Sequence, residues 1–207
     1  MKRYFVTGIG TDVGKTLASA VLTEALKADY WKPVQTGAVE DSDRSTVKQL
    51  VSNHQTIFPE ESYFFKEPTS PHQAAFLEHT RIDEAQIKLP VLKNETLIME
   101  GAGGLLVPLN ERFFVIDLAK RFDAEVILVC RNYLGCINHS LLSIDYLVRN
   151  NFRIKGLVLN GEFDPLVRSA IVGYGNFPVL AELPELPYLN KTNVKKLSGE
   201  INLNYFT

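Results

Sequence analysis

The sequence contains little cysteine and no long hydrophobic run. Its 2 cysteines, Cys130 and Cys136, are too few for a disulfide framework and lack the C-x-x-C spacing of a metal site. We interpret them as reduced thiols of a cytoplasmic protein. No stretch approaches the roughly 18–20 apolar residues of a membrane span, and the residues before Gly8 lack the roughly 7–15 apolar residues of a signal peptide. We therefore expect a soluble, intracellular protein that does not act at a membrane.

An excess of charge of one sign is also missing. The chain carries 22 Lys+Arg against 24 Asp+Glu, a formal net charge of −2. Without a basic face, nothing in the composition predicts a nucleic-acid partner. Glycine and proline, 13 and 10 residues, are close to their usual shares, which argues against a collagen-like or disordered chain. A length of 207 residues predicts one domain over residues 1–207, large enough to bury a core without disulfides.

Short apolar runs alternate with segments whose apolar residues recur at helical spacing. This alternation predicts βαβ units, and hence a single α/β domain with three layers, a parallel sheet flanked by helices. The expected strands are Tyr4–Thr7, Tyr30–Val34, Leu97–Glu100, Val126–Cys130, Gly156–Asn160 and Phe177–Ala181. The expected helices are Lys15–Ala28, Phe114–Phe122 and Asn138–Asn150. We expect Asn53–Val91 to be largely irregular.

Polar residues and glycines follow the expected strands, where open parallel sheets bind their ligands. The turn Gly8–Thr16 contains Gly14-Lys15-Thr16. A phosphate-binding loop requires glycines that let backbone N–H groups surround phosphate oxygens, a lysine that reaches the β/γ phosphates and a hydroxyl that holds Mg²⁺. The strict G-x-x-x-x-G-K-[ST] template fails, because Ile9 stands where it needs glycine and Gly8 lies one residue earlier. A glycine-rich turn with an exposed lysine is the alternative, but the strand before it and the helix after it favour a phosphate loop.

Carboxylates provide candidate Mg²⁺ ligands. Glu100 ends an apolar strand and is followed by Gly-Ala-Gly-Gly, whose bare backbone allows an anion to approach. Asp43, in Asp41-Ser42-Asp43, is a second candidate, although this segment could equally form the N-cap of a helix that begins near Arg44. Glu100 could also be an ordinary solvated residue at a strand end.

Other side chains at strand ends are less informative. Lys32 precedes Pro33 and could be a solvated edge residue. Asn160 could pair with the donor and acceptor edge of adenine or form an Asn-Gly turn. We expect His54 and His79 on the surface; no two of the 4 histidines have metal-ligand spacing, and no Ser/His/Asp triad can be assembled.

Five segments, taken together, closely resemble the motifs of the dethiobiotin synthetase family. They occur in the family's order and cover residues 1–161; the first is shared with a wide ATPase superfamily, but the combination is far more specific. The segments are Gly8-x-x-Thr11-x-x-Gly14-Lys15-Thr16, Lys32-Pro33-Val34-Gln35-Thr36-Gly37, Glu67-Pro68-Thr69-Ser70-Pro71-His72, Glu100-Gly101-Ala102-Gly103-Gly104 and Leu134-Gly135-Cys136-Ile137-Asn138-His139.

The resemblance implies a P-loop NTPase-like fold and an ATP-dependent ligase of biotin biosynthesis. Such enzymes use Mg²⁺, ATP and CO₂ or bicarbonate to close a ureido ring on 7,8-diaminononanoate, giving dethiobiotin, ADP and phosphate. One amine captures CO₂ as a carbamate, the γ-phosphoryl group moves to the carbamate, and the second amine attacks the mixed anhydride. The resemblance further implies a homodimer with the active site at the subunit interface.

The resemblance also assigns roles to individual residues. It implies that Lys32 is catalytic and that Thr16, Asp43 and Glu100 bind Mg²⁺. The implied nucleotide-binding residues are Asp12, Val13, Gly14, Lys15, Thr16, Leu17, Asp43, Glu100, Gly101, Ala102, Gly103, Asn160, Gly161, Pro184, Glu185 and Leu186. The implied substrate-binding residues are Thr11, Thr36, Gly135, Cys136, Ile137 and Asn138.

The chain departs from the family pattern at three places. Asp12 stands where glutamate is frequent and Thr36 where serine is frequent, and both changes keep the functional group. The segment between Thr36 and Asp43 is short, so the role of Asp43 depends on where the fold places it. The tail beyond about Leu186 aligns poorly, and we assign nothing there.

Two other functions are compatible with a phosphate loop. A related ligase acting on a larger substrate would normally need an additional glutamine-using domain, for which 207 residues leave no room. A nucleotide switch of the partitioning type would carry a lysine early in the loop, where this chain has Thr7, Gly8 and Ile9. Its membrane-acting members add a basic amphipathic tail, and residues 190–207 have too few apolar positions for one.

Overall fold

The main β-sheet is entirely parallel. The computed structural model describes residues 1–37 and 42–206. Within these residues the sheet has the strand order β2-β5-β1-β6-β7-β8, and a second, two-stranded parallel sheet pairs β3 with β4. The main strands are β1 (Lys2–Gly8), β2 (Asp29–Trp31), β5 (Thr96–Gly104), β6 (Glu125–Arg131), β7 (Ile154–Asn160) and β8 (Val179–Leu183). The strands of the small sheet are β3 (Val34–Thr36) and β4 (Tyr63–Phe65).

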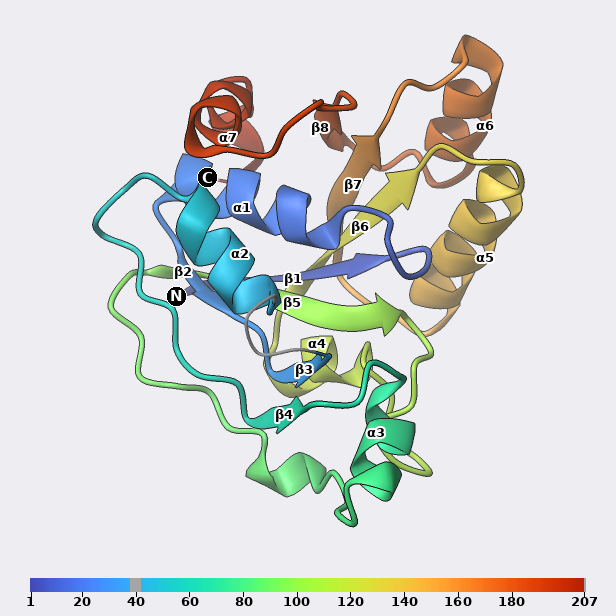
Figure 1. Cartoon of the computed structure of the whole chain (residues 1–207). Helices are drawn as coiled ribbons and strands as arrows, with labels where there is room; N and C mark the ends of the chain where they lie inside the picture. The colour runs from blue at the N-terminus through green and yellow to red at the C-terminus, as the bar shows by residue number, and fades with distance from the viewer. Residues whose placement is uncertain (38–41, 207) are drawn as a thin grey trace.

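Helices cover both faces of the main sheet (Figure 1). The helices are α1 (Lys15–Leu26), α2 (Asp43–Leu50), α3 (Pro71–Leu77), α4 (Asp117–Arg121), α5 (Cys136–Arg149), α6 (Pro165–Gly175) and α7 (Lys191–Ser198). Two short 3₁₀ helices are η1 (Glu84–Gln86) and η2 (Leu203–Phe206). The predicted three-layer α/β fold is therefore confirmed. Every helix of the described ranges is too short or too polar to cross a membrane.

The strands are continuously apolar because successive side chains enter opposite cores. In β1, Tyr4 and Val6 pack into one core with α1, α2 and α7, whereas Phe5 packs into the other with α3, α4, α5 and α6. The core that contains Tyr4 also includes residues from the C-terminal end of the chain, where the rings of Tyr4 and Phe206 meet edge to face at 5.2 Å. The tail left unassigned from sequence is thus part of the fold.

Several predicted boundaries need correction. The predicted strand Tyr30–Val34 is wrong, because the chain leaves the main sheet after Trp31 and enters the small sheet at Val34. Pro33 lies between the two strands; it has no N–H for a ladder, and its carbonyl accepts hydrogen bonds from the N–H groups of Ser62 and Tyr63 at 2.9 and 3.2 Å.

The predicted helix Phe114–Phe122 is also too long. Phe114 instead forms an antiparallel bridge with Pro108, and Val115 and Ile116 form a turn before α4, in which the N–H of Val115 donates to the carbonyl of Val107 at 2.9 Å. The helix α5 begins at Cys136, two residues before the predicted start at Asn138. Strand β8 begins and ends two residues later than the predicted strand Phe177–Ala181. The stretch Asn53–Val91 is largely irregular, as predicted, with only β4, α3 and η1 in it.

Candidate active site

The turn between β1 and α1 has the backbone of a tight anion-binding loop. Gly14 caps α1 in the left-handed region at φ +90°, and Asp12 also has a positive φ of 56°. A Cβ atom added to Gly14 would lie 2.1 Å from Nδ2 of Asn160, at the end of β7. Only glycine fits this position, both for its backbone conformation and for the space beside it. The one-residue departure from the strict template therefore leaves an ordered strand-loop-helix turn.

Lys15 and Thr16 begin α1 directly after this loop. Lys15 is buried, and its Nζ donates a hydrogen bond to the carbonyl of Gly10 at 3.0 Å. Burial lowers the pKa of its ammonium group from the usual value. The carbonyl of Gly10 is a weak partner for an ammonium ion, so phosphate oxygens would replace it readily. An exposed lysine on a glycine-rich turn, the alternative considered from sequence, does not describe this geometry.

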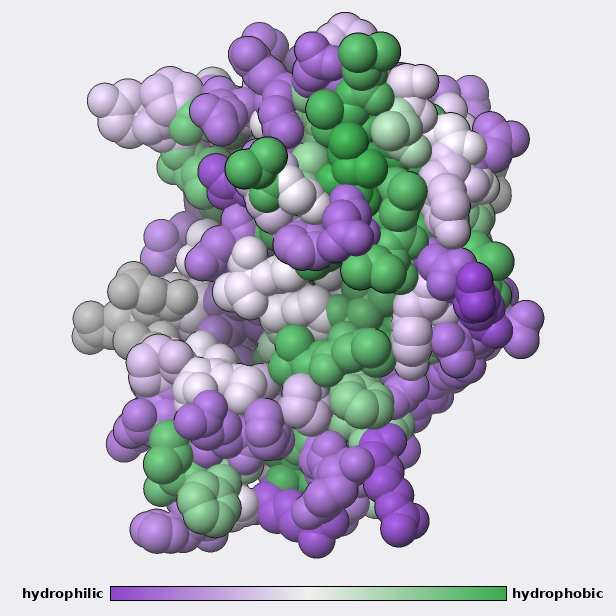
Figure 2. Space-filling view, turned by 90° about the vertical axis from the view of Figure 1, so that its right-hand side faces the viewer, coloured by the Kyte–Doolittle hydropathy of each residue, from purple (hydrophilic) through white to green (hydrophobic). Residues whose placement is uncertain are grey.

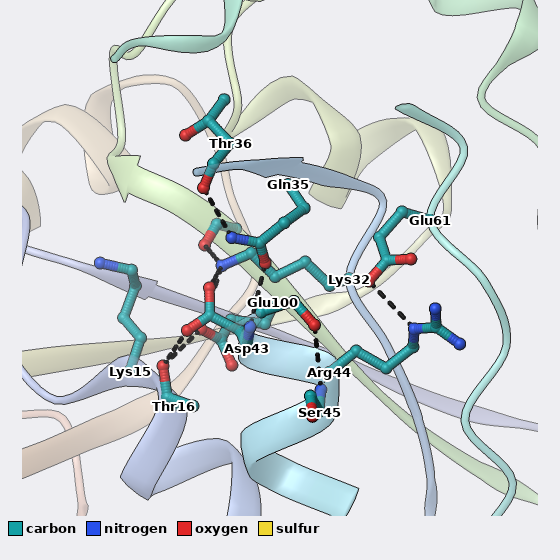
Figure 3. A network of polar contacts seen from close by, with 12 residues as sticks. Lys15, Thr16, Lys32, Gln35, Thr36, Asp43, Arg44, Ser45, Glu61 and Glu100 are labelled. Carbon is teal, nitrogen blue, oxygen red and sulfur yellow. Dashed lines mark hydrogen bonds and ion pairs between the residues drawn. The ribbon is translucent and has the colours of Figure 1, made fainter. Parts of the chain in front are cut away.

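Four functional side chains come together from the start of α1, the end of β2, the start of α2 and the middle of β5 (Figure 3). The predicted strand Leu97–Glu100 extends to Gly104, so Glu100 does not end it. Nζ of Lys32 forms an ion pair with Oδ2 of Asp43 and a second one with Oε1 of Glu100 at 3.2 Å. The hydroxyl of Thr16 lies 2.5 Å from Oδ1 of Asp43 and 3.2 Å from Oε1 of Glu100. Lys32 and Glu100 are almost completely buried, so neither is the solvated strand-end residue that the sequence left open.

The charges of this cluster stabilise one another. Burial acts to lower the pKa of Lys32, but the adjacent carboxylates of Glu100 and Asp43 outweigh it and raise the pKa above the usual value. Burial acts to raise the pKa of Asp43, but the Lys32 ammonium and the Thr16 hydroxyl hold it below the usual value. At neutral pH, Lys32 is therefore a cation and Asp43 an anion.

The segment Ser42-Asp43 serves both functions that the sequence left open. The hydroxyl of Ser42 is the N-cap of α2 and accepts a hydrogen bond from the N–H of Ser45 at 3.2 Å. Capping by Ser42 leaves the Asp43 carboxylate free to face Thr16 and Lys32. Residues 38–41, which make up most of the short segment noted from sequence, lie outside the described residues.

Two further side chains belong to the cluster and were not found by sequence reasoning. The buried hydroxyl of Tyr30 donates to Oε2 of Glu100 at 3.0 Å. The side-chain amide of Gln35 accepts from the N–H of Asp43 at 3.1 Å and donates to the carbonyl of Thr36 at 2.8 Å. A signal for Tyr30 exists in its position two residues before Lys32, since residues i and i+2 of a strand share a face.

Two cavities, one above the cluster and one beside it, gather most of the predicted site residues. The first, of about 450 Å³, is lined by Thr11, Asp12, Gly14, Lys15, Thr16, Lys32, Gln35, Thr36, Asp43, Glu100, Ala102, Gly103 and Arg131. The second, of about 300 Å³, is lined by Gly14, Leu17, Arg131, Asn160, Gly161, Pro184, Glu185, Leu186 and Leu189. Because Gly14 and Arg131 line both cavities, the two adjoin and can hold the two ends of one nucleotide.

Two predicted nucleotide contacts can act only through their backbone. The Val13 side chain is buried in the core, but its carbonyl accepts a hydrogen bond from Nδ2 of Asn160 at 2.9 Å. The carbonyl of Gly101 faces Nζ of Lys32 at 3.3 Å. Arg131 lies at the end of β6 and lines both cavities. Its Nη1 donates to the carbonyl of Asp12 at 3.0 Å, so β6 and β7 both support the phosphate loop.

The predicted substrate residues at the start of α5 do not line either cavity. Gly135, with φ +100°, is the N-cap of α5, and Ile137 and Asn138 are exposed. Cys136 differs, because its thiol is buried in the core of its own chain and its N–H donates to the carbonyl of Tyr133 at 3.0 Å. Of this stretch, the side chains of Ile137 and Asn138 are therefore the ones that face outward.

The oxygen atoms of the cluster fit a magnesium ion. No group of three or more His, Cys, Asp or Glu side chains that could hold a metal occurs among the described residues. The chain offers instead one hydroxyl, from Thr16, and two carboxylates, from Asp43 and Glu100. Mg²⁺ is commonly bound by one or two carboxylates together with substrate phosphates, so this donor set suits Mg²⁺ bound with a nucleotide.

Comparisons with known proteins agree with this geometry. The sequence profile of the AAA domain family matches residues 2–193. The chain is 45% identical over 206 residues to the ATP-dependent dethiobiotin synthetase BioD of Cytophaga hutchinsonii, covering 100% of both chains. It is 45% identical over 195 residues to the BioD of Christiangramia forsetii, covering 94% of this chain and 93% of the relative.

The fold is also similar to a solved structure with a different name. The septum site-determining protein MinD of Pyrococcus horikoshii, solved with Mg-ADP, superposes with a TM-score of 0.57 at 15% identity, covering 96% of this chain and 95% of that one. At such low identity the likeness establishes the P-loop ATPase fold alone.

Proposed function

The chain belongs to the dethiobiotin synthetase family, and from this premise we propose how its two cavities serve an ATP-dependent ligase of biotin biosynthesis. The enzyme closes the ureido ring of dethiobiotin with ATP. What supports the proposal most strongly in the geometry is Lys32, a buried cation held between Asp43 and Glu100 at the floor of the larger cavity. The partitioning switch has no comparable support, because the likeness to MinD extends only to the fold.

The proposed substrates are 7,8-diaminononanoate, CO₂ or bicarbonate, and ATP. One amine of the diamine adds to CO₂ and gives a carbamate. A carbamate oxygen attacks the γ-phosphorus and ADP leaves, which produces a carbamic–phosphoric anhydride. The second amine then attacks the carbonyl carbon and phosphate leaves, closing the ring. Phosphoryl transfer of this kind requires chiefly positioning and charge neutralisation.

The residues of the larger cavity supply that positioning. Lys15 and the loop from Asp12 to Leu17 hold the phosphates, and the backbone of Gly101–Gly103 lies opposite them. Lys32 stabilises the negative charge of the carbamate and of the transferred phosphoryl group, and Thr11 and Thr36 contact the diamine. Thr16, Asp43 and Glu100 would hold Mg²⁺, which neutralises phosphate charge. The same proposal places the enzyme in the cytoplasm, where the unpaired Cys130 and Cys136 stay reduced.

The smaller cavity would hold the nucleotide base between Asn160, Gly161 and residues 184–186. The hydrogen bond from Nδ2 of Asn160 to the carbonyl of Val13 fixes the orientation of the amide, and we propose that Oδ1 accepts from the base. An acceptor at this position favours a base with an amino group, such as adenine, over one with a carbonyl group. We expect inosine triphosphate, the oxo counterpart of ATP, to bind roughly tenfold more weakly, the effect of about one hydrogen bond. Displacement of a fluorescent ATP analogue measures this, and equal affinities would contradict the assigned orientation of Asn160.

A homodimer completes the proposed site. Figure 2 shows a hydrophobic band across the face that carries α5 and α6. The exposed apolar residues of these two helices include Ile137, Leu142, Val148, Leu166 and Tyr174. Apolar patches of this kind commonly mark protein–protein interfaces. In the proposal, the start of α5, with Gly135 to Asn138, binds the substrate carboxylate of the facing subunit.

The dimer makes a direct prediction for Leu142, which is 61% exposed on α5. We expect Leu142→Glu to give monomers by light scattering at micromolar concentration and to lose most of the ligase activity, because a buried charge opposes association. Leu203→Glu, at a leucine of similar exposure in η2, is the matched control and should remain a dimer. A parent protein that is monomeric at this concentration would refute the shared site.

The function itself is tested by the dependence of ATP turnover on the other substrates. Release of ADP should require both the diamine and bicarbonate, since the phosphoryl acceptor is the carbamate that they form together. Release of ADP at the same rate without the diamine would show that the protein is an ATPase of another kind.

A further inference from the structure

Tyr30 is a buried phenol that points from the edge of the main sheet to the carboxylate of Glu100. Its side chain is completely buried, and its hydroxyl lies 3.0 Å from Oε2 of Glu100. Strand β2 pairs with β5 in parallel, with Tyr30 opposite Ile98, so Glu100 lies two residues beyond the partner of Tyr30 on the neighbouring strand. Lys32, two residues further on, reaches the same carboxylate.

The two oxygens of Glu100 have different partners. Oε2 accepts from Tyr30, whereas Oε1 lies 3.2 Å from the hydroxyl of Thr16 and 3.2 Å from Nζ of Lys32. The carboxylate is itself almost fully buried, at 1% exposure, so water cannot take the place of a missing donor. Of the protein contacts described for Glu100, the one from Tyr30 alone reaches Oε2, and it fixes which oxygen turns toward the phosphate loop.

Core packing holds the ring of Tyr30 in place independently of the hydrogen bond to Glu100. It belongs to the core shared by α1, α2 and α7, with Ile98 and Val47, and lies 6.3 Å from the ring of Phe58. Because this packing orients the ring before any ligand binds, the direction of the hydroxyl is set by the fold. In this contact the phenol donates and the carboxylate oxygen accepts, which gives the contact a single direction.

We propose that Tyr30 is a positioning residue that fixes Glu100 so that Oε1 faces the magnesium ion bound with the nucleotide. This inference rests on the proposed function, in which Thr16, Asp43 and Glu100 hold Mg²⁺. Groups that orient a metal ligand commonly change metal affinity by about 10–100-fold when removed. A purely structural role for the phenol, as a satisfied polar group in the core, would affect unfolding but not the metal.

Tyr30→Phe separates these two roles, since it removes the hydroxyl and keeps the ring. We expect the variant–ADP complex to bind Mg²⁺ about 10–100-fold more weakly by calorimetry, while ADP binds with unchanged affinity in the absence of metal. Tyr4→Phe is the matched control: Tyr4 is a buried tyrosine of the same core, and its contacts are with Phe206 and Lys155 rather than the site. Thermal unfolding of both variants measures any structural effect separately.

Two further variants keep the outcomes distinct. Unchanged Mg²⁺ affinity in Tyr30→Phe, together with weakened affinity in Glu100→Gln, would overturn the role of Tyr30 and leave the proposed magnesium site standing. Unchanged Mg²⁺ affinity in Glu100→Gln would overturn the magnesium site itself. If Tyr30 acts through Glu100, adding Tyr30→Phe to Glu100→Ala should cause no additional loss of Mg²⁺ affinity. An additional loss as large as the one that Tyr30→Phe causes alone would show that Tyr30 acts independently of Glu100.

Discussion

Replacing Lys32 with alanine is expected to lower the rate of ring closure by about 10²–10³-fold while ATP affinity remains that of the parent protein. The reason is position: Lys32 lies at the floor of the larger cavity, whereas the contacts expected to bind the nucleotide come from the phosphate loop and the smaller cavity. Its charge is most needed in the transition state, when negative charge spreads over the carbamate and the transferred phosphoryl group. Single-turnover rates, with ATP affinity measured separately, test this.

Loss of the Lys32 ammonium has a second consequence that serves as an internal check. Asp43 and Glu100 would lose the cation between them, so their attraction for Mg²⁺ should stay the same or increase. A variant that loses activity through general damage would instead bind the metal less well. Lys155→Ala is the matched control, because Lys155 pairs with Glu125 on β6 at 3.5 Å, at the opposite end of the strands. Undiminished turnover in Lys32→Ala would remove Lys32 from the mechanism.

Gly14→Ala is expected to lower nucleotide affinity by a factor similar to that by which Lys32→Ala lowers the reaction rate. A left-handed backbone costs a residue with a Cβ atom roughly 1–2 kcal/mol, and the added atom would lie 2.1 Å from Nδ2 of Asn160. Relief of this contact must move either the phosphate loop or the Asn160 amide, and each faces the nucleotide. We therefore expect ADP affinity, measured by calorimetry, to fall by at least about 100-fold, or about 2.7 kcal/mol.

Gly10 in the same loop provides the control. A Cβ atom added there would meet nothing nearer than a methyl carbon of Val13 at 4.0 Å. Gly10→Ala should therefore bind ADP within a few-fold of the parent protein. Equal ADP affinity in Gly14→Ala and the parent would show that the left-handed turn at Gly14 is not needed for the nucleotide.

The sequence predicts those parts of the site that follow from the chain's own local order. Gly14, Lys15 and Thr16 lie at a strand-to-helix turn, and Lys32, Glu100 and Asn160 end apolar runs of the sequence, so the rule for parallel sheets places them at one edge. Except for the Gly135–Asn138 stretch, Val13 and Gly101, the predicted site residues line one of the two cavities. The carbonyls of Val13 and Gly101 contact Asn160 and Lys32, which do line them. The main error in the predicted fold was the single strand Tyr30–Val34, which the structure divides at Pro33. A proline inside a predicted strand already argues against a continuous central strand.

The contacts that sequence reasoning missed depend on pairing between distant segments. Tyr30 reaches Glu100 only because β2 pairs with β5, its neighbour in the sheet but not in the chain. Gln35, in β3 of the small sheet, joins the cluster because the start of α2 brings the N–H of Asp43 to its side chain. Arg131 supports the phosphate loop from β6, over a separation of 119 residues. Hydrophobic periodicity gives the type of an element, but not which elements become neighbours.

The central claim is that the protein uses ATP to form the carbon–nitrogen bonds that close a ureido ring. Incubation with the diamine, MgATP and isotopically labelled bicarbonate, followed by mass spectrometry, tests it most directly. We predict a cyclic product that carries the label at the carbonyl carbon of its ureido ring, formed together with an equal amount of ADP. Consumption of ATP with no labelled cyclic product would contradict the account.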